Sequence, residues 1–208
     1  MTSVKYKAVE FLIIFIIIPL SFALDYSPFI KMGIGLIGFM YVIYVLRKVE
    51  KEKFKLAPNL NWTSFWKSTI TKLLVIALIT FIFVWQTNKN ALFFVMLNKP
   101  QLWVFILFVY TFLSVYPQEL IYRTFYFKRY GVFIKNTKLF IFLNALVFSL
   151  AHILFKNTLV LILTFLGGIL FALTFTKTKS TLLVSIEHAI YGCWLFTVGM
   201  GEMLGFPT

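Results

Sequence analysis

Apolar residues occur along the chain in seven long runs, separated by short polar or charged stretches. A membrane-spanning helix needs about 20 predominantly apolar residues, because the hydrocarbon core is about 30 Å thick. The runs are Ala8–Leu24, Pro28–Leu46, Thr69–Gln86, Gln101–Pro117, Leu139–Phe155, Leu159–Thr176 and Thr181–Gly201. The pattern predicts an all-α fold, a polytopic membrane helix bundle of about seven transmembrane helices.

The composition supports this prediction and excludes a soluble domain. Hydrophobic residues make up 61% of the chain and charged residues 13%, with 26 phenylalanines, whereas a soluble domain has about 25% charged residues. A soluble fold of this length has too little interior to bury so much apolar surface. We therefore expect a multi-pass protein of the cell membrane that contacts membrane lipids. The single cysteine, Cys193, rules out an internal disulfide.

The basic residues predict the orientation in the membrane. If the N-terminus is cytoplasmic, 16 of the 20 Lys and Arg residues fall on the cytoplasmic side, and only Lys31, Lys89, Lys99 and Lys156 fall on the other. This asymmetry is the positive-inside pattern of membrane proteins. It predicts an N-in, C-out topology and explains the net charge of +13 without a nucleic-acid partner.

The first run has a second interpretation. Lys5 and Lys7 before an apolar segment are also typical of a secretory signal peptide. The sequence from Pro19 to Leu24 lacks a small-x-small cleavage site, however. We expect the segment to be retained as an anchor.

Ionisable residues inside apolar spans are costly and mark functional sites by default. Glu10 lies near the start of the first run, where it can extend to the interface and have a structural role. The other candidates are Glu119, Arg123, His152, Glu187 and His188, and the two histidines are the only ones in the chain. We expect Glu187, which points to a different helix face from His188, to be a supporting or packing residue.

The spacing of the candidates places them on shared helix faces. Residues four apart lie on one face, so Arg123 can orient the Glu119 carboxylate, and Phe148 can shield the His152 imidazole. Gly192, one turn after His188, leaves room for a neighbouring helix or a substrate. For these side chains to meet, the fourth helix must continue past Pro117, so we predict one helix from about Trp103 to Phe127.

Each feature also has a purely structural interpretation. Glu119 and Arg123 can be an ion pair at a helix end, and either histidine can hydrogen-bond between helices. Gly167 and Gly168 indicate a close helix crossing, and Cys193 is more typical of packing than of a nucleophile.

Three motifs in order resemble those of the CAAX protease and bacteriocin-processing family (CPBP, or Abi), intramembrane glutamic endopeptidases related to the Ras-converting CAAX endopeptidase. The Glu-Glu-x-x-x-Arg motif is matched by Gln118, Glu119 and Arg123, and Phe-x-x-x-His by Phe148 and His152. In the third motif, His188 is followed four residues later by Gly192, where the family has Asn or Asp. The resemblance covers about Leu102 to Gly201. It implies that residues 1–100 form three N-terminal spans and residues 101–208 a catalytic core of four.

The resemblance implies hydrolysis of a peptide bond in a membrane-associated peptide or protein. Glu119 would activate a water, Arg123 would position Glu119, and His152 would orient the water or share its proton. His188 would stabilise the oxyanion. No cofactor is expected. A Zn²⁺ held by Glu119, His152 and His188 is the alternative, disfavoured because His-Glu-x-x-His is absent.

Two departures, Gln118 and Gly192, keep a second function open. A catalytically inactive scaffold of the same fold would retain the motifs without the chemistry, and a proton-coupled transporter is a third interpretation. In a bacterium, the enzyme would process a bacteriocin or another peptide, or confer self-immunity. Prenylated substrates are expected in a eukaryote. The sequence does not indicate an oligomeric state.

Overall fold

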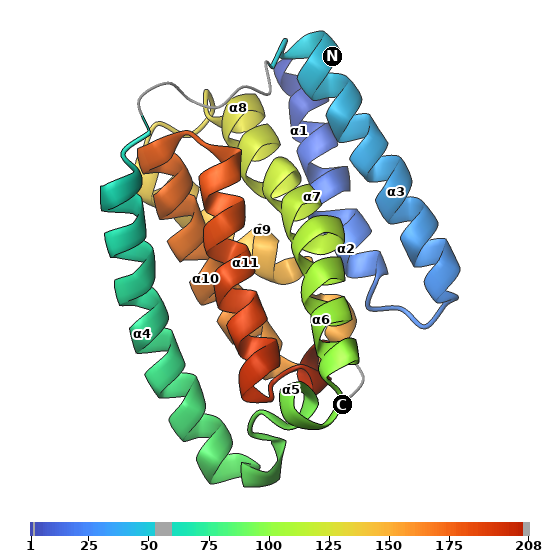
Figure 1. The fold of residues 1–208 in the computed structure, drawn as a ribbon. Coiled ribbons are helices and arrows are strands. Elements are labelled where there is room, and N and C mark those ends of the chain that lie inside the picture. Colours follow the sequence, from blue (N-terminus) through green and yellow to red (C-terminus); the bar gives the residue numbers. More distant parts are fainter. Residues whose placement is uncertain (2, 53–59, 206–208) are drawn as a thin grey trace. The chain divides into compact units, whose positions relative to one another are not determined.

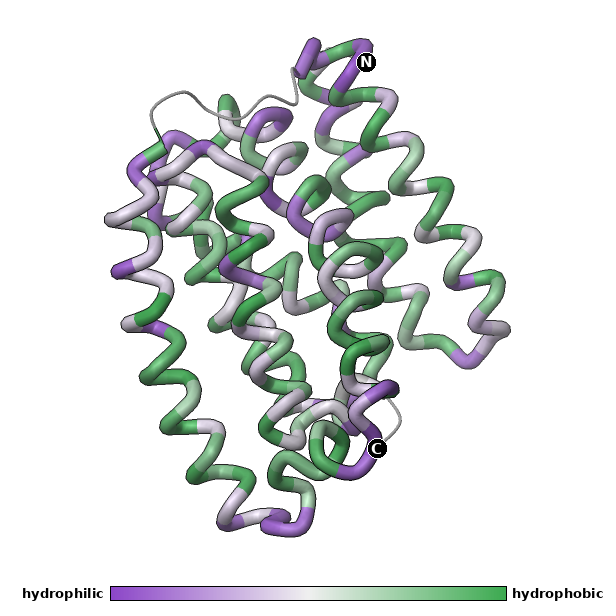
Figure 2. Tube along the Cα trace, viewed as in Figure 1, coloured by the Kyte–Doolittle hydropathy of each residue, from purple (hydrophilic) through white to green (hydrophobic). Residues whose placement is uncertain are grey.

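The computed structural model describes all 208 residues except 2, 53–59 and 206–208. In this described part, the regular structure is entirely helical (Figure 1), and six helices are long and apolar enough to cross a membrane. They are Pro28–Val49, Trp62–Thr87, Pro100–Tyr130, Thr137–Phe155, Thr158–Thr178 and Thr181–Val198. Figure 2 shows apolar positions along the middle of α4 and hydrophilic ones towards its ends. The prediction of an all-α, multi-pass membrane protein is confirmed.

The first predicted run is also helical, but it is not among the six. It comprises α1 (Val4–Leu12), the π-helical η1 (Ile13–Ile17) and α2 (Ile18–Ser21). Its 18 helical residues include the three charged residues Lys5, Lys7 and Glu10, whereas each of the six spans has an 18-residue stretch with at most two. The count of seven spans and the N-in, C-out orientation therefore stay predictions. Lys53 and Lys55, two of the basic residues counted as cytoplasmic, lie outside the described residues.

The chain forms two compact units, each assembled from two separate segments. Unit 1 comprises Met1–Lys55 and Gln118–Thr176, and unit 2 comprises Leu56–Pro117 and Lys177–Thr208. The predicted division is a different one, into N-terminal spans in residues 1–100 and a catalytic core in residues 101–208. It stays a prediction.

Unit 1 packs the first helical stretch against later helices. Its other elements are α3 (Pro28–Tyr44), η2 (Val45–Val49), η5 (Leu120–Phe125), α8 (Tyr126–Tyr130), α9 (Thr137–Leu150), η6 (Ile153–Phe155) and most of α10 (Thr158–Thr178). The fully buried ring of Phe15 lies 5.5 Å from those of Tyr122 and Tyr126. A Cβ on Gly168 would lie 2.9 Å from the Cα of Ala145, so α9 and α10 cross closely there, as predicted.

Unit 2 centres on the last long helix. Its elements are α4 (Trp62–Thr87), η3 (Lys89–Ala91), α5 (Phe94–Asn98), α6 (Pro100–Val109), η4 (Tyr110–Val115), α11 (Thr181–Val198) and η7 (Glu202–Leu204). An apolar cluster that includes Ile106, Tyr110, Ala189 and Phe196 joins α11 to the helix that begins at Pro100.

Polar residues between the runs define where helices begin. Asn136 Oδ1 accepts hydrogen bonds from the amides of Lys138 and Leu139 at the start of α9, and Ser180 Oγ accepts one from the Leu183 amide at the start of α11. These caps satisfy amides that have no partner within the helix. The helix that precedes His152 and the helix that carries His188 thus start at residues fixed by the sequence.

The predicted extension of the fourth helix is confirmed. Helical structure runs from Pro100 to Tyr130, through α6, η4, α7 (Tyr116–Glu119), η5 and α8. Two of these segments, η4 and η5, are π-helical and flank the turn that contains Pro117 and Glu119. Proline removes a backbone donor, and π segments shift the hydrogen-bond pattern and are frequent at functional sites.

Candidate active site

Glu119 and Arg123 form a completely buried ion pair in unit 1. Arg123 Nε lies 3.3 Å from Glu119 Oε2, and both side chains are fully shielded from solvent. The four-residue spacing that predicts this contact is preserved although Arg123 lies in the π segment η5. Because charges are strongly disfavoured inside a protein unless paired, the guanidinium holds the Glu119 side chain in one orientation. Gln118, the preceding residue, is partly buried.

Asn144 of α9 belongs to the same polar group, although sequence reasoning missed it. Its Oδ1 accepts a hydrogen bond of 3.0 Å from Arg123 Nη1, and its Nδ2 donates one of 2.6 Å to the Tyr122 carbonyl. A buried asparagine in an apolar run is itself a signal, and Asn144 precedes Phe148 by four residues and His152 by eight. The Asn144 side chain thus holds the Arg123 guanidinium from a second helix, α9.

Two aromatic rings cover the guanidinium. The Cζ atom of Arg123 lies 4.7 Å from the ring centroid of Phe148 and 5.8 Å from that of Phe171. Both distances are within the range of cation–π attraction. Phe148 therefore has a double role, since its ring also lies 4.8 Å from the imidazole of His152.

His152 lies just beyond the α-helical part of its span, where the prediction places it inside a helix. Helix α9 ends at Leu150, and His152 has φ −93° and ψ 6° before the short 3₁₀ turn η6. Many active-site residues adopt this sparsely populated backbone region. The imidazole Nδ1 lies 2.8 Å from the Phe148 carbonyl oxygen, so it carries the hydrogen that it donates. In the neutral ring, Nε2 is then the atom that can accept a proton or a hydrogen bond.

His188 and Gly192 lie in unit 2, on one face of α11. His188 is buried, and its ring packs edge-on against Tyr110 at a centroid distance of 6.0 Å. Gly192 lies one turn later, also against Tyr110. The neighbouring residue Glu187 is fully buried on another face, where it pairs with Lys72 of α4 and accepts a 2.9 Å hydrogen bond from Tyr191. Glu187 thus joins α11 to α4, in agreement with the supporting role expected for it.

The candidates therefore form two sets, one in each unit. In unit 1 a chain of contacts joins Glu119, Arg123, Phe148 and His152. In unit 2 Tyr110 contacts His188 and lies against Gly192. A meeting of Glu119 with His188 stays a prediction. Within the described part of each unit, no three His, Cys, Asp or Glu side chains are grouped as metal ligands would be.

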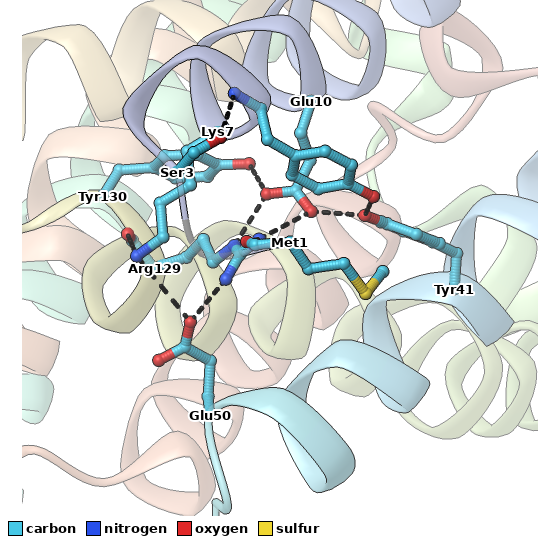
Figure 3. Close-up of polar contacts among 9 residues, drawn as sticks. Met1, Ser3, Lys7, Glu10, Tyr41, Glu50, Arg129 and Tyr130 are labelled. Carbon is cyan, nitrogen blue, oxygen red and sulfur yellow. Dashed lines mark hydrogen bonds and ion pairs between the residues drawn. The ribbon is translucent and has the colours of Figure 1, made fainter.

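A second buried charge cluster anchors the end of the helix that carries Glu119 (Figure 3). Arg129 donates to Glu10 through Nε, at 2.7 Å, and to Glu50 through Nη1, at 2.7 Å. Glu10 also accepts hydrogen bonds from the hydroxyls of Tyr41 and Tyr130. The expectation that Glu10 extends to the interface is therefore wrong, because the carboxylate turns inward and is buried. Removal of the first run as a signal peptide would leave Arg129 without Glu10.

Comparison with known proteins finds a family model that matches part of the chain. Residues 100–194, a little under half of the chain, match the sequence model described as Type II CAAX prenyl endopeptidase Rce1-like. Glu119, Arg123, Phe148, His152 and His188 all lie inside this segment. No curated protein and no solved structure matches the chain. The family resemblance predicted from the three motifs is confirmed.

Proposed function

We propose that this multi-pass membrane protein, whose residues 100–194 resemble the Rce1-like CAAX endopeptidases, hydrolyses peptide bonds within the membrane. The observation that carries the proposal is the family match, because its segment contains all the motif residues in order. The buried pair of Glu119 with Arg123 supports it. Burying ionisable side chains in an apolar span lowers the stability of the fold, and such residues are usually kept for function.

In the proposed reaction, Glu119 acts as the general base. It takes one proton from a water molecule while the water oxygen bonds to the substrate carbonyl carbon, giving a tetrahedral oxyanion. The carbon–nitrogen bond then breaks, and the proton held by Glu119 passes to the departing amine. The products are one peptide with a new carboxylate and one with a new amino group. Arg123 does not react; it holds the Glu119 carboxylate towards the water.

The two histidines have separate roles in this proposal. His152 accepts a hydrogen bond from the attacking water through Nε2, since its Nδ1 hydrogen is engaged by the Phe148 carbonyl. His188 donates a hydrogen bond to the oxyanion, where few water molecules screen the interaction. The acceptor role requires a neutral His152 imidazole, and both roles require rings whose orientation is fixed by neighbouring residues.

The proposed substrate is a membrane-associated peptide or protein. The family name points to prenylated peptides that end in a CAAX sequence. A bacteriocin or another secreted peptide is the substrate that we propose for a bacterial setting, with peptide processing or self-immunity as the outcome. The partners are then the substrate and membrane lipids.

The proposal is tested with the purified protein in lipid nanodiscs. The probes are a farnesylated peptide ending in a CAAX sequence and a mixture of unprenylated membrane-inserting peptides, with products identified by mass spectrometry. Replacing Glu119 with Gln should reduce the rate roughly 10²- to 10⁴-fold, the usual contribution of a general base. Glu202→Gln, at an exposed glutamate, is the matched control and should cleave normally. Equal rates for the wild type and Glu119→Gln would refute the proposal.

An inactive scaffold is the second candidate, favoured by Gln118 and Gly192 in place of the family's acidic or amide residues. Such a protein would keep its cellular effect after Glu119→Gln, because binding a partner does not require the base. A cell-based assay of peptide resistance or secretion, run on the same variant, separates the two functions.

A further inference from the structure

Gly192 is the point where the third motif departs from the family pattern, and Tyr110 occupies the space beside it. A Cβ atom on Gly192 would lie closer than 3.0 Å to the hydroxyl oxygen and to two ring carbons of Tyr110. Gly192 is in the middle of α11 and is not among the glycines with positive φ. The close approach of Tyr110, and not the backbone conformation, therefore favours glycine here.

Tyr110 is held firmly in this position. It is buried at the start of the π segment η4, and its ring lies 6.0 Å from the His188 ring and 4.8 Å from the Phe196 ring, nearly perpendicular to both. Residues 188, 192 and 196 are on successive turns of one face of α11. The Tyr110 side chain thus lies against three successive turns of α11, with its hydroxyl next to Gly192 on the central turn.

This arrangement places a phenol hydroxyl and an imidazole side by side on a helix face that is otherwise apolar. Ile106, Ala189 and Phe196 belong to the same cluster as Tyr110. A tyrosine hydroxyl donates one hydrogen bond, and an imidazole N–H donates another. Hydrogen-bond donors in apolar surroundings are the usual means of stabilising an oxyanion, because their effect is large where water is excluded.

We propose that the Tyr110 hydroxyl donates a hydrogen bond to the oxyanion of the proposed reaction, next to the one from His188. The inference rests on the proposed function and adds a catalytic residue to it. The hydroxyl lies where a side chain at position 192 would leave the helix, so it takes the place of the motif's Asn or Asp. Tyr110 transfers no proton; it only stabilises the charge that forms on the carbonyl oxygen.

The first test compares cleavage of the farnesylated CAAX peptide by single variants. Tyr110→Phe keeps the ring and removes only the hydroxyl, so kcat should fall roughly 10²-fold while KM and the thermal unfolding temperature stay unchanged. Tyr116→Phe, an exposed tyrosine on the same helix, is the matched control and should retain full activity. Wild-type kcat in Tyr110→Phe would show that the tyrosine only fills space and would overturn the inference.

A reciprocal exchange tests whether positions 110 and 192 share one role. Gly192→Asn alone should lose activity because its side chain collides with Tyr110. Tyr110→Ala alone should lose the donor, and the double variant Tyr110→Ala/Gly192→Asn should regain at least tenfold over Tyr110→Ala, because the asparagine amide enters the vacated space. A double variant no better than Tyr110→Ala would contradict the exchange.

Binding of a transition-state mimic separates failure of this inference from failure of the proposed function. The probe is the same peptide with a phosphinate in place of the scissile amide, compared with the intact amide peptide bound to Glu119→Gln. The wild type should bind the phosphinate peptide more tightly than Glu119→Gln binds the amide peptide, which is a preference for the transition-state mimic. Tyr110→Phe should bind the phosphinate peptide at least tenfold more weakly than the wild type, with unchanged affinity for the amide peptide. If the wild type has no such preference, both proposals fail. If Tyr110→Phe keeps the preference, only the role of Tyr110 fails.

Discussion

Asn144 holds Arg123 from a neighbouring helix, with its Oδ1 accepting a 3.0 Å hydrogen bond from Arg123 Nη1. The amide of Asn144 is itself fixed, because Nδ2 donates to the Tyr122 carbonyl. Asn144 therefore orients the Glu119 carboxylate indirectly. It fixes the position of the Arg123 guanidinium, and the guanidinium fixes the position of the carboxylate. This makes Asn144 a positioning residue for the proposed general base.

Asn144→Ala should lower kcat about tenfold, or about 1.4 kcal/mol of transition-state stabilisation, with little change in KM. The physical reason is that Arg123 loses one of its anchors and holds Glu119 less firmly. Steady-state kinetics on the CAAX peptide measures the effect. Asn98→Ala, at an exposed asparagine, is the control and should behave as the wild type. A change in KM alone would argue against a positioning role.

Glu10→Ala should destabilise the protein by about 3 kcal/mol, because it leaves the buried Arg129 guanidinium with one carboxylate partner fewer. Thermal unfolding of the purified protein, followed by circular dichroism in one detergent, measures the loss. The exposed pair of Asp25 and Lys156 offers a control. Asp25→Asn should change stability by less than about 0.5 kcal/mol, since exposed ion pairs contribute little. Equal effects of the two variants would mean that the cluster in Figure 3 does not anchor the first helix.

Gly168→Ala should destabilise the protein, and Gly35→Ala should not. A methyl group at 168 would meet backbone and side-chain atoms of Ala145, so α9 and α10 must separate, at a cost of about 1–3 kcal/mol. At Gly35 in α3, nothing lies within 4 Å of the added atom. Alanine there should be neutral or stabilise by about 0.5 kcal/mol through its better helix propensity. Unfolding temperatures of the pair, measured side by side, test the close crossing. A harmless Gly168→Ala would mean that the two helices are not in tight contact.

Hydrolysis should survive removal of metal ions, because the proposed base and oxyanion donors are protein side chains. The measurement is the rate after dialysis against 1,10-phenanthroline, compared with dialysis against its non-chelating 1,7 isomer. A chelator-specific loss that Zn²⁺ reverses would instead assign Glu119, His152 and His188 as ligands and replace the metal-free mechanism.

The sequence was informative where a pattern repeats along one helix. Apolar runs predicted the spans, and four-residue spacing predicted the contacts of Arg123 with Glu119 and of Phe148 with His152. It was less informative where partners lie far apart in the chain. Glu10 and Arg129 are 119 positions apart, and no local pattern joins them. The sequence shows that Gly192 lacks the motif's side chain, but it does not show that Tyr110 lies in that space. The position of His152 beyond the end of α9 depends on a local turn, and boundaries of this kind are the least predictable part of a helix.

The pairing of Glu10 with Arg129 also has a consequence for biosynthesis. The ribosome must add 119 further residues after Glu10 before the arginine that neutralises it is made. Until then a buried Glu10 lacks its main partner, and burial of an unpaired charge is costly. Packing of the first helix around Glu10 is then a late event, completed only when the helix that carries Glu119 has been synthesised to its end.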